Sequence, residues 1–455
     1  MNENISLSES FVRGEAATRV WGVFAKGASV GSAFLILSSL TPYQYGVWYL
    51  FLSFYEIFSQ TLDLGAGAIK NDIMRFIGTK DFGRAKKLFF EHQSVRMLIG
   101  AVLWAAFFFG APFLEARYKA DFIFLIRISS FLFLLEFISS AMQALLTTQF
   151  RFGASARVFA YAKVVQFLAL LGFYLSLYIG IKEAVIALLV SQVVAIIFIL
   201  PTVIHEWRPW KERQAAGDWL IFKILSGHGK WDISRLFVSG ITSRLQPFVI
   251  KLFLNTEAVG IYGVAKSMVE LVISFLSSNT LDSLVPRLIS EPDKARRVFV
   301  FGTKYMVMVS IGAIAAGIFG AFVLFNLFFE NYLAALPYFY FLALILPMLV
   351  AGQIIDVFLI IWRKQKFTFM RSVTRGILWI GLLVILLPVA GLWGGIAAEL
   401  FAVLLSVVWS YVYLIKLEPS FRPKAKELFS FGASDKEIRD IIFRNFLRII
   451  RLDKR

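Results

Sequence analysis

The sequence predicts an all-α integral membrane protein with twelve transmembrane helices. Its 455 residues are 58% hydrophobic and 17% charged, and the mean hydropathy is +0.72. Soluble domains average about 45–50% apolar and about 25% charged residues. Twelve apolar runs also come close to the roughly 20 residues that an α-helix needs to cross a bilayer core. These observations exclude an ordinary soluble protein.

The predicted spans follow one another along the chain, with short polar segments between them. Their limits are residues 18–40, 44–69, 95–114, 121–147, 158–180, 184–205, 232–254, 259–285, 303–328, 335–361, 371–388 and 392–415. The first run occupies the position of a secretory signal peptide, but Glu3, Glu9 and Glu15 precede it and the run is long. We therefore interpret it as a membrane span.

Basic residues predict the orientation of these spans. One set of alternate segments, residues 1–19, 70–96, 149–163, 206–235, 287–304, 363–375 and 416–455, carries 39 Lys and Arg residues. The other connections carry only Arg117, Lys119 and Lys182. Under the positive-inside rule this asymmetry predicts a cell membrane protein with both termini in the cytoplasm. The net charge of +17 is thus an orientation signal, and we expect no nucleic-acid partner.

The side chains that usually hold metals are scarce. The chain has no Cys and only three His residues, His92, His205 and His228, which are far apart in the sequence. This composition excludes disulfides, thiolate metal sites and a Cys nucleophile. We expect neither a metal nor another cofactor.

An internal repeat divides the spans into two sets of six. At an offset of 214 residues, Tyr45-Gly46-Val47-Trp48 aligns with Val259-Gly260-Ile261-Tyr262, and Glu56 aligns with Glu270. Because six is an even number of crossings, the two halves would run parallel. Both acids lie about ten residues deeper than the glycines, near the middle of their spans.

Five short segments carry a resemblance to a known family: residues 41–48 (TPYQYGVW), 62–65 (LDLG), 77–88 (IGTKDFGRAKKL), 258–262 (AVGIY) and 285–288 (VPRL). In these segments, and across all twelve spans, the chain resembles the polysaccharide flippase branch of the multidrug/oligosaccharidyl-lipid/polysaccharide exporter (MOP) superfamily. The resemblance implies two six-helix bundles around a central cavity that alternates between inward-open and outward-open forms. It also implies an anionic lipid-linked sugar as the cargo.

This organisation predicts four regions. They are an N-terminal six-helix bundle (1–205), a cytoplasmic connecting loop (206–230), a C-terminal six-helix bundle (231–416) and a basic cytoplasmic tail (417–455). The tail places six Ile and Phe side chains broadly on one helical side and basic residues on the other. It is therefore expected to lie on anionic lipids, to dock a glycosyltransferase or polymerase of the same pathway, or simply to remain solvated.

Charged residues inside the spans provide the candidate site. Lys26, Arg244 and Lys251 form the predicted binding set for an anionic pyrophosphate, because small residues surround Lys26 and because the two cations of the seventh span lie two turns apart. Pro247 between them is expected to bend that helix. Arg127 and Lys266 are further candidates. Arg127 can instead extend to the membrane surface, and Lys266 can pair with Glu270 four residues on.

Acidic residues in the spans are candidates for coupling or gating. They are Glu56, Asp63, Glu270 and Asp356. Glu56 and Glu270 are expected either to pair with the basic residues when no cargo is bound or to take part in proton or cation coupling. Asp356 lies close enough to the predicted cytoplasmic boundary to be solvated there.

Three functions remain open at this point. The first is a non-enzymatic flippase that moves a polyprenyl-pyrophosphate-linked oligosaccharide from the cytoplasmic to the outer leaflet. The second is a drug/cation antiporter of the same superfamily. The third, a membrane polysaccharide polymerase or ligase, would need a sizeable external loop, whereas every external connection predicted here has about a dozen residues or fewer.

Overall fold

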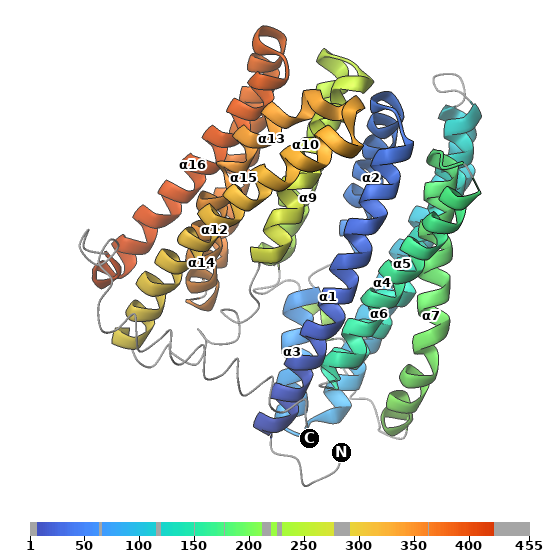
Figure 1. The fold of residues 1–455 in the computed structure, drawn as a ribbon. Helices are drawn as coiled ribbons and strands as arrows, with labels where there is room; N and C mark the ends of the chain where they lie inside the picture. Colours follow the sequence, from blue (N-terminus) through green and yellow to red (C-terminus); the bar gives the residue numbers. More distant parts are fainter. Residues whose placement is uncertain are drawn as a thin grey trace, which may run out of the picture. The chain divides into compact units, whose positions relative to one another are not determined.

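The computed structural model describes residues 7–62, 66–114, 120–149, 151–176, 178–211, 220–224, 230–276, 292–362 and 364–422, and the regular elements in these ranges are all helices. The chain separates into two compact units, Met1–Gly240 and Ile241–Arg455. Figure 1 shows the helices of each unit. The boundary between the units falls within a single helix, α9 (Lys230–Phe253).

The N-terminal unit is built from long helices. They are α1 (Leu7–Ser39), α2 (Pro42–Leu62), α3 (Ala66–Gly78), α4 (Phe82–Gly110), α5 (Ala120–Thr148), α6 (Phe152–Leu175) and α7 (Ile181–Lys211), with the short α8 (Ile221–Ile224) and the 3-10 helix η1 (Ala111–Leu114). Within this unit α1 lies along α6, α6 along α7 and α4 along α5 (Figure 1).

The C-terminal unit begins in α9. It continues with α10 (Thr256–Leu276), α12 (Pro292–Phe328), η4 (Glu330–Ala335), α13 (Leu336–Ala343), α14 (Leu346–Ile361), α15 (Gln365–Ala390), α16 (Leu392–Leu417) and η5 (Pro419–Phe421). Here α15 packs against α16, and α14 packs against both α12 and α16 (Figure 1). The turn between α15 and α16 is tight. Gly391 has a positive φ of 57°, a conformation that side chains with a Cβ rarely adopt.

The predicted all-α membrane fold is confirmed, and each of the twelve predicted spans overlaps a described helix. Eight described helices are long and apolar enough to cross a membrane, and a bent pair gives a ninth candidate. The remaining three predicted spans coincide with α2, α9 and α10, which have 21, 24 and 21 residues.

One predicted span is broken. The sequence predicts a continuous helix over 335–361, whereas the structure has α13 and α14, which meet at a bend of 43°. Pro347 lies in the first turn of α14, where its missing N–H costs no helical hydrogen bond. The apolar run conceals this break because both halves are equally hydrophobic.

The 214-residue offset also relates two helix starts. Before α2, Thr41 Oγ1 accepts from the Gln44 backbone N–H at 3.3 Å, and Gln44 Oε1 accepts from the Thr41 backbone N–H at 2.9 Å. This reciprocal pattern is a capping box. Before α10, the side chain of Asn255 accepts from the Ala258 backbone N–H at 2.7 Å. Both caps satisfy backbone donors that a helix start leaves open.

The segment that follows α7 is anchored on the N-terminal unit. Ile221 is 1% exposed and packs in a cluster with Ile69, Ile73 and Leu88. The carboxylate of Glu91 on α4 accepts from the backbone N–H groups of Leu220 and Ile221 at 2.8 and 2.9 Å. The predicted connecting loop 206–230 thus begins within α7 and docks in part on α4. The predicted amphipathic part of the tail lies outside the described residues.

Candidate functional site in the membrane-spanning helices

The most deeply buried acid in the described C-terminal unit is Glu399 on α16, which is 7% exposed. One of its carboxylate oxygens forms an ion pair with the Lys266 ammonium of α10. The other accepts from the Tyr262 hydroxyl at 2.7 Å. Lys266 and Tyr262 are one helical turn apart on α10, so one carboxylate holds both side chains. This contact joins α10 to α16.

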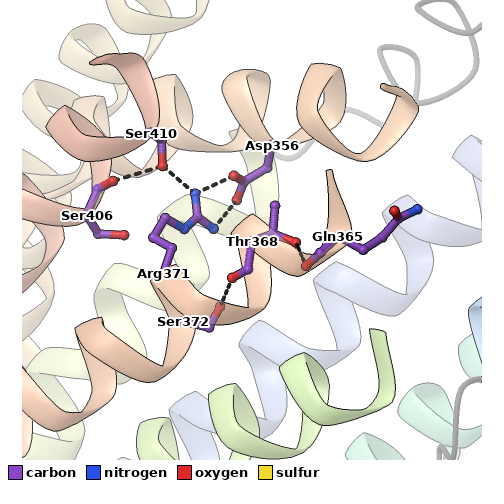
Figure 2. A network of polar contacts seen from close by, with 7 residues as sticks. All are labelled: Asp356, Gln365, Thr368, Arg371, Ser372, Ser406 and Ser410. Carbon is purple, nitrogen blue, oxygen red and sulfur yellow. Dashed lines mark hydrogen bonds and ion pairs between the residues drawn. The ribbon is translucent and has the colours of Figure 1, made fainter. Parts of the chain in front are cut away.

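A second network joins three helices at Arg371 (Figure 2). Asp356 projects from α14, Arg371 from α15 and Ser410 from α16. Two nitrogens of the guanidinium face the two oxygens of the carboxylate, with Nη2 and Oδ2 2.8 Å apart. Nη1 also donates to the Ser410 hydroxyl at 2.7 Å, and that hydroxyl donates to the Ser406 carbonyl at 2.9 Å. Such a bidentate pair fixes direction as well as distance.

A third pair is much looser. Arg244 on α9 and Glu270 on α10 approach to 3.7 Å between Nη1 and Oε1, and their side chains are 25% and 43% exposed. Ion pairs with this geometry and exposure contribute little to stability. An anion that reached Arg244 could therefore displace Glu270 at small cost.

In the N-terminal unit, the half-buried acid Glu136 is bound by hydroxyl groups. Glu136 on α5 accepts from the hydroxyls of Tyr55 and Ser59 on α2, the second at 3.3 Å. Two cations of the same unit contact neutral groups. Arg96 on α4 donates to the Ser140 hydroxyl at 2.7 Å, and Lys163 on α6 donates to the Gln166 amide oxygen at 3.4 Å.

The predicted anion-binding residues differ in how exposed their side chains are. Lys26 is half-buried in α1, and the space beside neighbouring Gly22 and Gly27 is open. Gly31, further along α1, packs tightly against the Phe167 ring of α6. Lys251 is exposed in the last turn of α9. These placements leave the shared role of Lys26, Arg244 and Lys251 a prediction.

The other predicted residues are placed as follows. Arg127 is exposed on α5, with its guanidinium 5.9 Å from the centre of the Phe108 ring. Glu56 is half-buried on α2 and lies within electrostatic reach of Lys163. Asp63 lies outside the described residues. The equivalence of Glu56 and Glu270 in the two halves stays a prediction.

Two alternatives considered for single residues do not match the structure. Lys266 pairs with Glu399 of another helix, although Glu270 is four residues away on the same helix. Asp356 is 30% exposed, but it is also paired with Arg371, which the expectation of simple solvation did not include. Spacing along the sequence can only suggest partners on the same helix. Lys266 and Asp356 instead contact residues of other helices.

Sequence reasoning missed four important residues. Glu136 and Glu399 lie in the predicted spans 121–147 and 392–415 but are not among the candidates named above. Arg371 and Arg375 lie at the start of the predicted span 371–388, yet they are counted above only among the basic residues of segment 363–375. The structure places both inside α15, which begins at Gln365, and their four-residue spacing at the start of an apolar run is the signal that marks one helical face.

Charged side chains held inside a helix bundle in this way can recognise a charged molecule. In the described ranges no group of three His, Asp or Glu side chains is placed to hold a metal ion. The structure instead has tight interhelical ion pairs beside a weak one, inside a largely apolar bundle. Charges in such a setting are costly unless they face partners or water.

The fold is similar to that of solved transporters of the MOP superfamily. A multidrug resistance MATE family transporter in the inward-facing conformation matches with a TM-score of 0.68 at 14% identity, over 87% of this chain and 96% of that one. A MOP superfamily transporter from Pyrococcus furiosus, described as having a binding pocket of reverse polarity, matches with a TM-score of 0.59 at 16% identity, over 92% and 96% of the two chains.

The sequence itself then gives the family. A family model described as "Polysaccharide biosynthesis protein" matches residues 39–310, and the chain belongs to this family. The teichuronic acid biosynthesis protein TuaB of Bacillus subtilis (strain 168) is 24% identical over 257 residues, which are 53% of this chain and 50% of that protein. The match thus spans about half the length of TuaB. The resemblance to the polysaccharide branch of the MOP superfamily is confirmed.

Proposed function

We propose that this protein carries a lipid-linked oligosaccharide, attached through a polyprenyl pyrophosphate, from the cytoplasmic to the outer leaflet of the cell membrane. The cargo would feed the synthesis of a cell-surface polysaccharide such as a lipopolysaccharide or an exopolysaccharide. The observation that carries the proposal is the combination of a polysaccharide-biosynthesis sequence family with a MOP transporter fold. The function proposed is transport without catalysis.

The loose pair between Arg244 and Glu270 supports an anionic cargo. Because the two charged groups are 3.7 Å apart and partly exposed, the pair holds Arg244 weakly. A phosphate offers several acceptor oxygens to the planar guanidinium, so it competes well with one carboxylate. In this mechanism, cargo binding releases Glu270, and the two units alternate between inward-open and outward-open forms. Both termini would remain in the cytoplasm.

The proposal is tested first in cells. Deleting the gene should cause the completed oligosaccharide to accumulate on its lipid carrier, and this is measured by extracting lipids and separating the intermediates. An enzyme that polymerises or ligates the sugar would instead leave the lipid-linked unit in the outer leaflet. Accumulation of that unit outside, where added hydrolases reach it, would contradict the flippase function.

The second test uses purified protein in vesicles, with a fluorescent lipid-linked oligosaccharide as cargo. Arg244→Ala should abolish transfer between leaflets, while Arg244→Lys should keep part of it because it retains charge without the planar donor fork. Lys119→Ala, a charge in a predicted external connection, is the matched control. Normal transfer by an Arg244→Ala, Lys251→Ala double variant, inserted to the same level, would remove the proposed site.

Drug export is the second candidate, because the solved structures with this fold include multidrug transporters. Cationic drugs would need surplus acid, whereas the described C-terminal unit places Arg244, Lys266, Arg371 and Arg375 alongside Glu270, Asp356 and Glu399 in its helices. The same vesicles distinguish the two functions. Uptake of a cationic dye with no transfer of the lipid-linked sugar would favour the antiporter.

A further inference from the structure

Arg375 lies deep in a membrane-spanning helix and has no role so far. It is the eleventh residue of α15, roughly 15 Å from the first residue of the helix and roughly 22 Å from the last. Because α15 has 26 residues and is therefore roughly 39 Å long, while a bilayer core is about 30 Å thick, a helix centred in the bilayer holds Arg375 roughly 10 Å inside the core. A guanidinium at such depth must face protein or water, because facing lipid costs at least about 2.5 kcal/mol.

The burial pattern of α15 shows which way Arg375 points. Arg371 and Trp379, one turn before and one turn after it, are 9% and 8% exposed. Ile377 and Val384, on the opposite side of the helix, are 69% and 42% exposed, as expected of a face turned to lipid. Arg375 therefore lies in the middle of the buried arc, and yet it is itself exposed. Its exposure is on the protein side of the helix.

The acids in the helices of the described C-terminal unit each form an ion pair with a cation other than Arg375. Three acids lie in the helix interiors of the described C-terminal unit, and each contacts one cation, in the pairs Glu270–Arg244, Asp356–Arg371 and Glu399–Lys266. Arg375 is within electrostatic reach of Glu399, Asp356 and Arg371. Within the described ranges, however, no acid or hydrogen-bond partner contacts its guanidinium. The five N–H donors of Arg375 are thus available to an anion.

We propose that Arg375 binds the phosphate of the transported lipid-linked sugar, an assignment that rests on the proposed transport function. Arg371–Asp356 on one side and Lys266–Glu399 on the other hold their own charges in contact pairs. They therefore shape the surroundings of Arg375 without neutralising it. The guanidinium offers the planar donor fork that suits a phosphate or pyrophosphate.

The test measures binding of farnesyl diphosphate to purified protein in detergent micelles by titration calorimetry, with farnesol as the phosphate-free probe. Arg375→Gln should weaken farnesyl diphosphate binding about tenfold or more, and Arg375→Lys should weaken it less. Lys416→Gln, which removes an exposed cation at the end of α16, should bind like the unchanged protein. Farnesol binding should be the same in all four proteins.

Ligand-free thermal stability separates binding from a structural role. Removing Arg375 breaks no described contact, and it removes attraction to Glu399 and Asp356 as well as repulsion from Arg371, so Arg375→Gln should melt at nearly the same temperature as the unchanged protein. Equal affinity of Arg375→Gln and the unchanged protein would overturn the assignment, while the cellular deletion test would still stand. Displacement of farnesyl diphosphate by phosphatidylglycerol at comparable concentration would overturn it as well, because the site would then be occupied by bilayer headgroups.

Discussion

Glu399 in the C-terminal unit and Glu136 in the N-terminal unit differ in burial and in the contacts described above. Glu399 is buried and is bound by an ammonium and a hydroxyl, whereas half-buried Glu136 accepts from two hydroxyls. Removing the carboxylate from an ion pair leaves the charge of its partner behind. Hydroxyls, by contrast, can donate equally well to a neutral acceptor such as an amide oxygen. Neutralising the acid should therefore cost more at Glu399 than at the two hydroxyl contacts of Glu136.

Within the C-terminal unit, the distance between partners distinguishes ion pairs that hold helices together from a pair that could recognise cargo. The Glu399 and Asp356 networks each bridge helices with short contacts, while Arg244 and Glu270 meet at 3.7 Å. Tight pairs resist a competing anion and loose pairs yield to it. Substitutions at the tight pairs should thus lower stability, and those at the loose pair should mainly change cargo binding.

The largest effect is expected for Glu399→Ala. This change leaves the Lys266 ammonium, whose side chain is 22% exposed, beside Tyr262 without its carboxylate, and breaking a largely buried pair costs about 3–5 kcal/mol. The free energy of unfolding, measured by denaturant titration of protein in detergent micelles, should fall by about that amount.

A charge-neutral double variant sharpens this prediction. Lys266→Met together with Glu399→Gln removes both charges, so it should recover most of the stability that Glu399→Ala loses. Glu257→Gln, an exposed acid in the first turn of α10, is the control and should change stability little. If Glu399→Ala proved as stable as the double variant, Lys266 would not depend on that carboxylate.

A smaller loss is expected for Arg371→Ala. The change removes a bidentate pair and the bond to Ser410, but the Asp356 side chain is 30% exposed and can be solvated afterwards. We expect a loss of about 2 kcal/mol, in the range of charge-assisted hydrogen bonds. The same denaturant titration measures it.

The lysine variant tests whether the guanidinium geometry matters. Arg371→Lys keeps the charge but reaches only one carboxylate oxygen, so its stability should fall between those of Arg371→Ala and the unchanged protein. Arg297→Ala, an exposed arginine of α12, should have almost no effect. Equal stability of Arg371→Lys and the unchanged protein would show that charge alone holds α14 and α15 together.

The fold was predictable because apolar length is a direct physical requirement of the bilayer. Spans such as 158–180 and 392–415 overlap α6 and α16, since a run of about 20 apolar residues has few other stable forms. The break between α13 and α14 was not predictable from hydropathy, because Leu344 and Ile345 continue the apolar run.

The sequence identifies charged residues inside the spans, but it does not show which residues they contact. Charges inside spans, among them Arg244 and Glu270, were identified from the cost of placing them in lipid. The partners of Lys266 and Asp356 come from α16 and α15, at separations that no helical spacing encodes. Arg371 was missed because it lies both at the start of the predicted span 371–388 and in the basic segment 363–375, where the orientation rule alone accounts for its charge.

The smallest effect of the series is expected for Glu136→Gln. The amide oxygen can still accept from the hydroxyls of Tyr55 and Ser59, so these two hydrogen bonds lose only their charge assistance, about 1 kcal/mol. Tyr55→Phe removes one donor and leaves the other, and its cost should be similar. Denaturant titration should therefore give both variants a higher free energy of unfolding than Glu399→Ala, with Glu330→Gln as the exposed control.

A loss of 3 kcal/mol or more for Glu136→Gln, as large as for a broken buried pair, would contradict the difference expected between Glu136 and Glu399. It would mean that stability depends on the charge of Glu136 as strongly as on that of Glu399.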